Sequence, residues 1–311
     1  MAKTTFSGPV RSENNYKLIS KTASTGVVHD RSMGPGVKDA RRYYLEEWFK
    51  QRPQMNASLA SATEATRVVA NRDFETLGTN MTNALTTFSS THGGILMTTA
   101  GADQDQAILV PHVDTAQSAW DDVTWGTENS VEWEASISLP ALDNQKVWAG
   151  IKETGTADAQ LVVTDDDQAY FKYQTDANQA YFNFLTDSDN SGQDYDDFTK
   201  WHFVHSIGGT DYISVLPITV AANTPYHLKI EIDSDRKATI FVNGIQYNIT
   251  STSGSTGGTA VTTVQPSKSP TKSAALTNDV DLKPFIGIEA GDGAAEAINV
   301  HYQAISRLVF E

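Results

Sequence analysis

Glu231, Asp233 and Asp235 are spaced two residues apart, a pattern that could serve acid catalysis. On a strand, side chains two positions apart project from the same face. Retaining glycoside hydrolysis needs two carboxyl groups about 5–5.5 Å apart, one as nucleophile and one as acid. Asp233 and Asp235, however, belong to DSDRK, which separates two alternating apolar segments and has the composition of a turn. The sequence therefore predicts a hairpin turn here and no catalytic residue.

A second acidic segment, LTDSDNSGQDYDDF, begins like a calcium-binding loop. Counted from Asp187, oxygen-bearing side chains stand at the first, third and fifth positions, and Gly192 follows at the sixth. The twelfth position is Phe198, where such a loop needs a bidentate glutamate. We interpret the segment as a solvated acidic loop and predict no metal and no cofactor. The residues of the alternative cation site are Asp187, Asp189, Ser191 and Asp194.

The remaining reactive side chains form no compact motif. His202 and His205 are three positions apart on a predicted strand, so they face opposite sides and do not both ligate one metal. The chain has no cysteine, and no nucleophile elbow, Walker loop or dinucleotide-binding glycine motif occurs in it. Tryptophans could form a sugar platform, but in a sandwich they more often lie in the core or at a subunit interface. These tryptophans are Trp120, Trp125, Trp133, Trp148 and Trp201.

Charge is distributed unevenly along the 311 residues. Residues 1–80 hold 12 Lys and Arg against 8 Asp and Glu, whereas the rest hold 11 against 30. The acidic body argues against a nucleic-acid partner, because phosphate binding needs lysine and arginine. No apolar stretch approaches the roughly 18–20 residues that cross a bilayer, so no membrane partner is predicted.

Short alternating segments dominate from residue 94 onward. Many strands with little helix indicate a sandwich or barrel, and their number exceeds that of an immunoglobulin-type domain. The predicted fold is an all-β, jelly-roll or concanavalin-like antiparallel sandwich over residues 94–311, with 299–310 as a central strand. The expected strands are Ile95–Met97, Ala107–Val110, Val131–Leu139, Val147–Ile151, Gln160–Val163, Ala169–Gln174, Gln179–Leu185, His202–Ile207, Tyr212–Val215, His227–Ile232, Ala238–Val242, Pro284–Glu289 and Asn299–Phe310.

Residues 1–93 differ from this body in composition. The first forty residues are rich in Gly, Pro, Ser and Asn, and residues 54–92 have few apolar positions, so we expect an extended arm that folds against a partner. Within it, Tyr44, Leu45, Trp48 and Phe49 can share one helical stripe, which predicts a short helix near residues 37–51.

Two stretches resemble known proteins. The opening MAKTTFSGPVRSENNYKL resembles the start of virion structural proteins of tailed bacteriophages, and NTPYHLKIEIDSDRKATIFVNGIQY is similar to concanavalin-like or laminin-G-like sandwiches. The resemblance implies a non-enzymatic head decoration (cement) protein on the outer surface of the capsid. It would clamp adjacent subunits of the major capsid protein and associate with itself as a homotrimer. The expected capsid contacts are Arg11, Lys17, Arg31, Arg41 and Arg42.

Two other functions remain open. One is a carbohydrate-binding module of a tail or fibre, which would recognise a host-surface glycan through sandwich loops and tryptophans. The other, less favoured, is a glycoside hydrolase of similar fold that uses Glu231 and Asp233.

Overall fold

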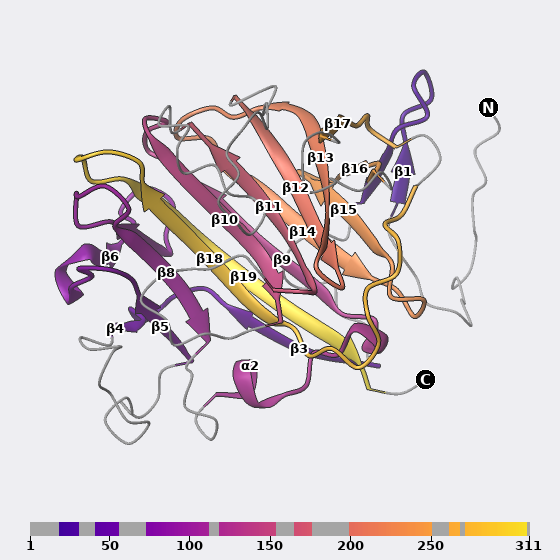
Figure 1. Ribbon diagram of the computed structural model, residues 1–311, viewed down its shortest axis with the longest axis horizontal. Coiled ribbons are helices and arrows are strands. Elements are labelled where there is room, and N and C mark those ends of the chain that lie inside the picture. The colour runs from indigo at the N-terminus through magenta and orange to yellow at the C-terminus, as the bar shows by residue number, and fades with distance from the viewer. Residues whose placement is uncertain are drawn as a thin grey trace, which may run out of the picture.

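The chain forms two facing β-sheets (Figure 1). The computed structural model describes residues 19–30, 41–55, 73–111, 118–153, 165–175, 199–250, 261–267 and 271–309. Nearly all strand pairs are antiparallel, and the described parallel pairs, β13 with β17 and β4 with β5, lie at the two edges of one sheet.

Sheet A has the order β1-β2-β16-β15-β14-β9-β19-β7-β6, and β3 also pairs with β19. Its strands are β1 (Ile19–Lys21), β2 (Val28–Asp30), β3 (Arg42–Glu47), β6 (Thr86–Phe88), β7 (Ile95–Thr98), β9 (Glu132–Ser138), β14 (Tyr226–Ile232), β15 (Ala238–Val242), β16 (Ile245–Tyr247) and β19 (Ala297–Leu308).

Sheet B has the order β17-β13-β12-β11-β10-β18-β8-β5-β4. Its strands are β4 (Gln54–Met55), β5 (Phe74–Leu77), β8 (Gln106–Pro111), β10 (Gln145–Lys152), β11 (Gln168–Gln174), β12 (Lys200–Ile207), β13 (Thr210–Thr219), β17 (Val261–Thr263) and β18 (Lys283–Ala290). The described helical turns are α2 (Ala119–Asp122), η1 (Asn83–Leu85) and η2 (Thr127–Asn129).

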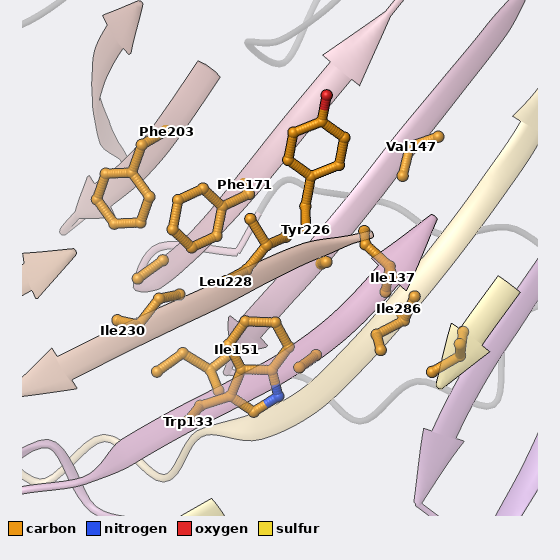
Figure 2. Close-up of a cluster of buried hydrophobic side chains, with 14 of the residues drawn as sticks. Trp133, Ile137, Val147, Ile151, Phe171, Phe203, Tyr226, Leu228, Ile230 and Ile286 are labelled. Atoms are coloured by element: carbon orange, nitrogen blue, oxygen red, sulfur yellow. The ribbon is translucent and has the colours of Figure 1, made fainter. Parts of the chain in front are cut away.

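The main core lies between the two sheets. Alternate residues of each strand point inward, as the pleat requires, and they form one continuous apolar cluster. Figure 2 shows Trp133 and Leu228 of sheet A close to Ile151 and Phe171 of sheet B. Burial of this apolar surface is the main source of stability in a chain without disulfides.

The predicted fold class, an all-β sandwich of jelly-roll or concanavalin-like type, is confirmed. Of the expected strands, those at 160–163 and 179–185 lie outside the described residues, and the others are present with small shifts at their ends. β19 is central, as predicted, because it pairs with β9, β7 and β3.

The short helix predicted near residues 37–51 is wrong. Residues 42–47 form strand β3, which pairs antiparallel with β19 from Gln303↔Glu47 to Leu308↔Arg42. The helical pattern came from four apolar residues, but two adjacent tyrosines favour a strand, and the β19 ladder supplies hydrogen-bond partners. Tertiary pairing therefore overrides the local pattern.

The chain before residue 94 also contributes to both sheets. β5 pairs with β8 in sheet B, and β6 pairs with β7 in sheet A. Phe49, Phe74 and Leu77 are buried, with at most 3% of each exposed. The predicted boundary between residues 93 and 94 therefore does not separate an arm from the sandwich in the described part of the chain.

Candidate functional site

The outer face of sheet B, which points away from sheet A, carries the most concentrated polar chemistry. Val147 and Ala149 of β10 enter the main core, whereas Trp148 between them joins a second buried cluster. Tyr170, Val204 and Phe285 belong to that second cluster. The alternation places polar and charged residues of the same strands on this outer face as well.

Lys172 lies at the centre of the face. The strand register places Trp148 of β10 on one side of it and His202 of β12 on the other. Tyr170 and Gln174 lie two positions away along β11, on the same face. We call these five residues the Lys172 cluster. Each of them is buried, with at most 5% of its surface exposed.

Several polar atoms of the Lys172 cluster lack partners, and His202 Nε2 is one of them, although His202 Nδ1 lies 3.1 Å from the Lys200 carbonyl oxygen. The indole Nε1 of Trp148, the hydroxyl of Tyr170, and both amide atoms of Gln174 are buried and make no hydrogen bond within the described structure. Buried polar groups are normally satisfied, and each exception calls for an explanation. A bound polar ligand would explain the unpartnered atoms of Trp148, Tyr170 and Gln174 together.

An ion pair lies beside the cluster. Glu289 of β18 stands between Lys146 of β10 and Gln106 of β8 in the register. Lys146 Nζ lies 2.5 Å from Glu289 Oε1, and the Gln106 amide donates to the other carboxylate oxygen. These bonds fix Glu289 as an acceptor that is already occupied.

A second polar group lies at the opposite end of the face. The Ser206 hydroxyl donates to Asp211 Oδ1, and Gln168 Nε2 donates to Ser206 Oγ over 3.0 Å. Burial raises the pKa of Asp211 to about 6, although Ser206 and Lys172 act in the opposite direction. Lys152 Nζ lies 3.5 Å from Asp165 at the same end.

Burial also shifts the titration of the cluster itself. It lowers the pKa of Lys172 well below its usual range, and the neighbouring charge of Lys146 adds to this effect. Burial, with the carboxylates of Asp211 and Asp165, raises the pKa of Tyr170 well above its usual range. Tyr170 is therefore a neutral phenol at ordinary pH, able to donate and to accept.

Gly150 allows the strands under this face to approach closely. A Cβ at this position would lie 2.4 Å from the Ala169 carbonyl oxygen and 2.5 Å from Tyr170 Cα. Across this glycine the rings of Tyr170 and Phe285 meet edge to face, with centroids 5.8 Å apart. The pair limits the motion of the Tyr170 ring and so positions its hydroxyl.

The predicted cation site, Asp187, Asp189, Ser191 and Asp194, lies outside the described residues. Arg11, Lys17 and Arg31 of the predicted capsid contact also lie outside them. In the described part of the chain, no group of three or more His, Asp or Glu side chains is placed to hold a metal ion. No described helix is long and apolar enough to cross a membrane.

Arg42 is placed differently from the sequence prediction. Its Nη2 donates to the Ser130 and Ser306 carbonyl oxygens over 2.6 and 3.1 Å, and its Nη1 lies 3.3 Å from Glu132. Its side chain is only 11% exposed. Arg42 therefore fastens β3 to the sandwich, and its guanidinium is already engaged within the chain. Arg41 immediately precedes β3, and its carbonyl accepts from the Val309 amide.

Glu231 and Asp233 have structural partners. Lys229 Nζ lies 2.8 Å from Glu231 and 3.3 Å from Glu132. Asp233 Oδ1 accepts from the amides of Asp235 and Lys237, both over 2.9 Å. These last bonds cap the turn between β14 and β15, which matches the predicted hairpin.

The five tryptophans lie in two places. Trp120, Trp125, Trp133 and Trp201 lie in the main core, which confirms the prediction for them, whereas Trp148 lies on the outer face. His202 and His205 face opposite sides of β12, also as predicted, because His205 is paired with Ala169 of the main core.

A surface cavity of about 220 Å³ lies elsewhere, where β3 ends and β5 begins. Phe49 lies beside it in the left-handed region, with φ of 52°. Glu47 accepts from the Phe49 amide, Asp73 accepts from the Ser118 hydroxyl, and Arg52 donates to a backbone carbonyl. These charged groups serve the local fold, so we place the functional site on sheet B.

Sequence reasoning missed most of the Lys172 cluster. KVWAGIK and YFKYQ each place polar or charged residues at alternate positions in strands that are otherwise apolar. In a strand buried on both faces, that alternation was the available signal. It does not identify which strands are neighbours, and the cluster exists only because β10, β11 and β12 are adjacent.

Comparison with known proteins gives a distant likeness only. No family model matches the chain, and no curated protein matches it. A protein of unknown function from Shewanella oneidensis is 9% identical, covering 86% of each chain with a TM-score of 0.43. The carbohydrate recognition domain of Emp47p is 9% identical, covering 88% of this chain and 100% of that one, with a TM-score of 0.46. A Bacillus licheniformis β-glucanase is 11% identical over 84% and 97%, with a TM-score of 0.41. Likeness at this level transfers no function.

Proposed function

We propose that the protein binds carbohydrate on the outer face of sheet B. The observation that carries this proposal is the set of buried, unpartnered polar atoms on Trp148, Tyr170 and Gln174. Sugar hydroxyls both donate and accept, so one ring can satisfy an indole N–H, a phenol and an amide together. Aromatic side chains with a polar end combine apolar contact with such hydrogen bonds.

We propose binding without catalysis. Glycoside hydrolysis needs one carboxyl group free to protonate the leaving oxygen and a second to attack or to activate water. On this face Glu289 already accepts from Lys146 and Gln106, and Asp211 already accepts from Ser206. Glu231, the sequence candidate, belongs to the other sheet. The polar groups left on this face, those of Trp148, Tyr170 and Gln174, can form hydrogen bonds to a sugar and hold it in place.

Glycan-array screening followed by titration calorimetry tests the proposal. Trp148→Phe and Tyr170→Phe each remove one polar atom and keep an aromatic ring. Each substitution should lower affinity by about 1–3 kcal/mol, because a ligand group buried against the site loses its partner. That energy corresponds to roughly a 5- to 150-fold rise in Kd.

Trp48→Phe is the matched control, because Trp48 follows β3 of the other sheet and is 41% exposed. It should leave glycan affinity unchanged. If no glycan binds, or if the control weakens binding as much as Trp148→Phe does, the proposal is wrong.

A virion role stays a second proposal, supported by the charge division of the sequence. The basic residues Arg11, Lys17 and Arg31 precede β3, the first described strand that pairs with central strand β19. A chain that starts at residue 41 would keep β3 and lose all three. Under this proposal it would fold but no longer sediment with phage heads, whereas the full chain would. Equal sedimentation of both chains would refute the role of these residues.

A further inference from the structure

We infer that the sugar bound on sheet B carries an acetamido group, held between the Trp148 indole and the Gln174 amide. The inference rests on the proposed carbohydrate binding and specifies the class of sugar. Trp148 Nε1 and both amide atoms of Gln174 are buried without a hydrogen-bond partner in the described structure. A ligand at this point must offer an acceptor to the indole N–H, and it can offer a donor to the Gln174 carbonyl oxygen.

The strand register sets the distance that this ligand group must bridge. Trp148 of β10 is paired with Lys172 of β11, so Gln174 is a diagonal neighbour of Trp148 on the same face. Diagonal neighbours in an antiparallel pair lie about 7–8 Å apart, within reach of aromatic and long side chains. The C=O and N–H groups of a trans secondary amide point in opposite directions. One acetamido group can therefore accept from Trp148 on one side and donate to Gln174 on the other.

Trp148 stands where the face changes from polar to apolar. Lys172 is paired with it on one side, whereas Gly287 and then Ile108 follow on the other. Trp148 and Ile108 belong to one buried apolar cluster, and the glycine between them adds no side chain. An acetamido group matches this boundary, because its carbonyl oxygen is polar and its methyl group gains from burial on the apolar side.

Charges near this position are balanced within the chain, which favours a neutral sugar. Lys146 Nζ lies 2.5 Å from Glu289 Oε1. The carboxylates of Glu289 and Asp211 also act electrostatically on Lys172. A uronic acid or a free amino sugar would bring an uncompensated charge to this buried face, whereas an acetamido sugar brings none.

The test compares oligosaccharides of equal linkage and length that differ only in an acetamido or a hydroxyl group at carbon 2. Oligomers of N-acetylglucosamine are paired with those of glucose, and oligomers of N-acetylgalactosamine with those of galactose, by calorimetry on the full chain. In at least one pair the acetamido sugar should bind at least about tenfold more tightly, since the other sugar leaves buried polar atoms unpartnered. This preference should change little with salt, because it involves no ion pair.

Three variants test the assignment of the side chains. Trp148→Phe and Gln174→Met remove polar atoms and keep apolar bulk, and each should remove most of the preference. Tyr170→Phe removes a contact to a ring hydroxyl, so it should weaken both members of a pair equally and leave their ratio unchanged. Gln246→Met is the matched control, because Gln246 is a buried glutamine of β16 in the other sheet. It should change neither affinity nor preference.

Thermal unfolding of each variant shows that it is folded. If a glycan binds but no pair shows the preference, this inference is wrong and carbohydrate binding stands. A preference that survives either Trp148→Phe or Gln174→Met, or one that Gln246→Met removes, would also overturn the inference alone. Absence of binding to any glycan would overturn both proposals.

Discussion

His205 is a titratable residue buried away from the Lys172 cluster, in the main layer between the sheets. Its ring stacks on Tyr212 with centroids 4.8 Å apart, and neither ring nitrogen has a partner in the described structure. Burial lowers its pKa to about 3. The folded protein therefore holds this imidazole neutral at pH values where an exposed histidine is protonated.

This shift predicts a loss of stability in mild acid. Between about pH 6.5 and pH 3 the unfolded chain binds a proton at His205 that the folded protein does not bind, so the unfolding free energy falls as pH falls. Lowering the pH from 7 to 5 should cost about 2 kcal/mol through this residue alone. His205→Phe keeps the ring stack and should remove that part of the loss in urea titrations.

His92→Phe is the control for this measurement, because His92 is exposed. It should retain the pH dependence of the wild-type protein. If His205→Phe and the wild-type protein lose the same stability between pH 7 and pH 5, His205 is not the source.

At the scale of elements, the attachment of strand β3 to the sandwich depends on the side chain of Arg42. Arg42 makes two bonds to backbone carbonyls, one to the Ser306 hydroxyl at 2.8 Å, and an ion pair with Glu132. Arg42→Met should destabilise the protein by about 1–3 kcal/mol, because the carbonyl oxygens of Ser130 and Ser306 lose this donor in a half-buried site. Chemical denaturation measures the difference.

Lys50→Met serves as the control, since Lys50 is an exposed residue just after the same strand. It should change stability by less than about 0.5 kcal/mol. If Arg42→Met has a similarly small effect, Arg42 is not needed to hold β3 against the sandwich. Arg42 would then again be a candidate for contact with a partner protein.

The same strand shows where sequence reasoning ends. Alternation predicted β9 and the β14–β15 hairpin because their partners are local or their pattern is regular. The pattern around Tyr44 and Leu45 fits a helix or a strand, and only β19, some 260 residues later in the chain, decides between them. The Lys172 cluster has the same origin. Its members come from three strands, and no spacing along the chain encodes their adjacency.

At the scale of the whole molecule, the sandwich includes more of the N-terminal chain than its composition suggests. The Phe74 ring packs edge to face on both Phe49 and Trp120, with centroid distances of 5.6 and 4.7 Å. Leu77 belongs to the outer-face cluster with Trp148. Residues of the predicted arm therefore complete the main core and also border the proposed glycan site.

Truncation separates the part of the N-terminal chain that the sandwich needs from the part that it does not. A chain that starts at residue 94 lacks β3, β5 and β6, and it loses Phe49 and Phe74 from the main core. Loss of one buried phenylalanine side chain typically costs about 3–5 kcal/mol, and the total stability of a protein is about 5–15 kcal/mol. We expect this chain to show no cooperative unfolding transition and to aggregate.

A chain that starts at residue 41 keeps these elements and loses only β1 and β2. Because β1 and β2 lie at the edge of sheet A, this chain should still unfold cooperatively. Near-UV circular dichroism during urea unfolding compares the two, and equal transition midpoints would show that the sandwich begins at residue 94 after all.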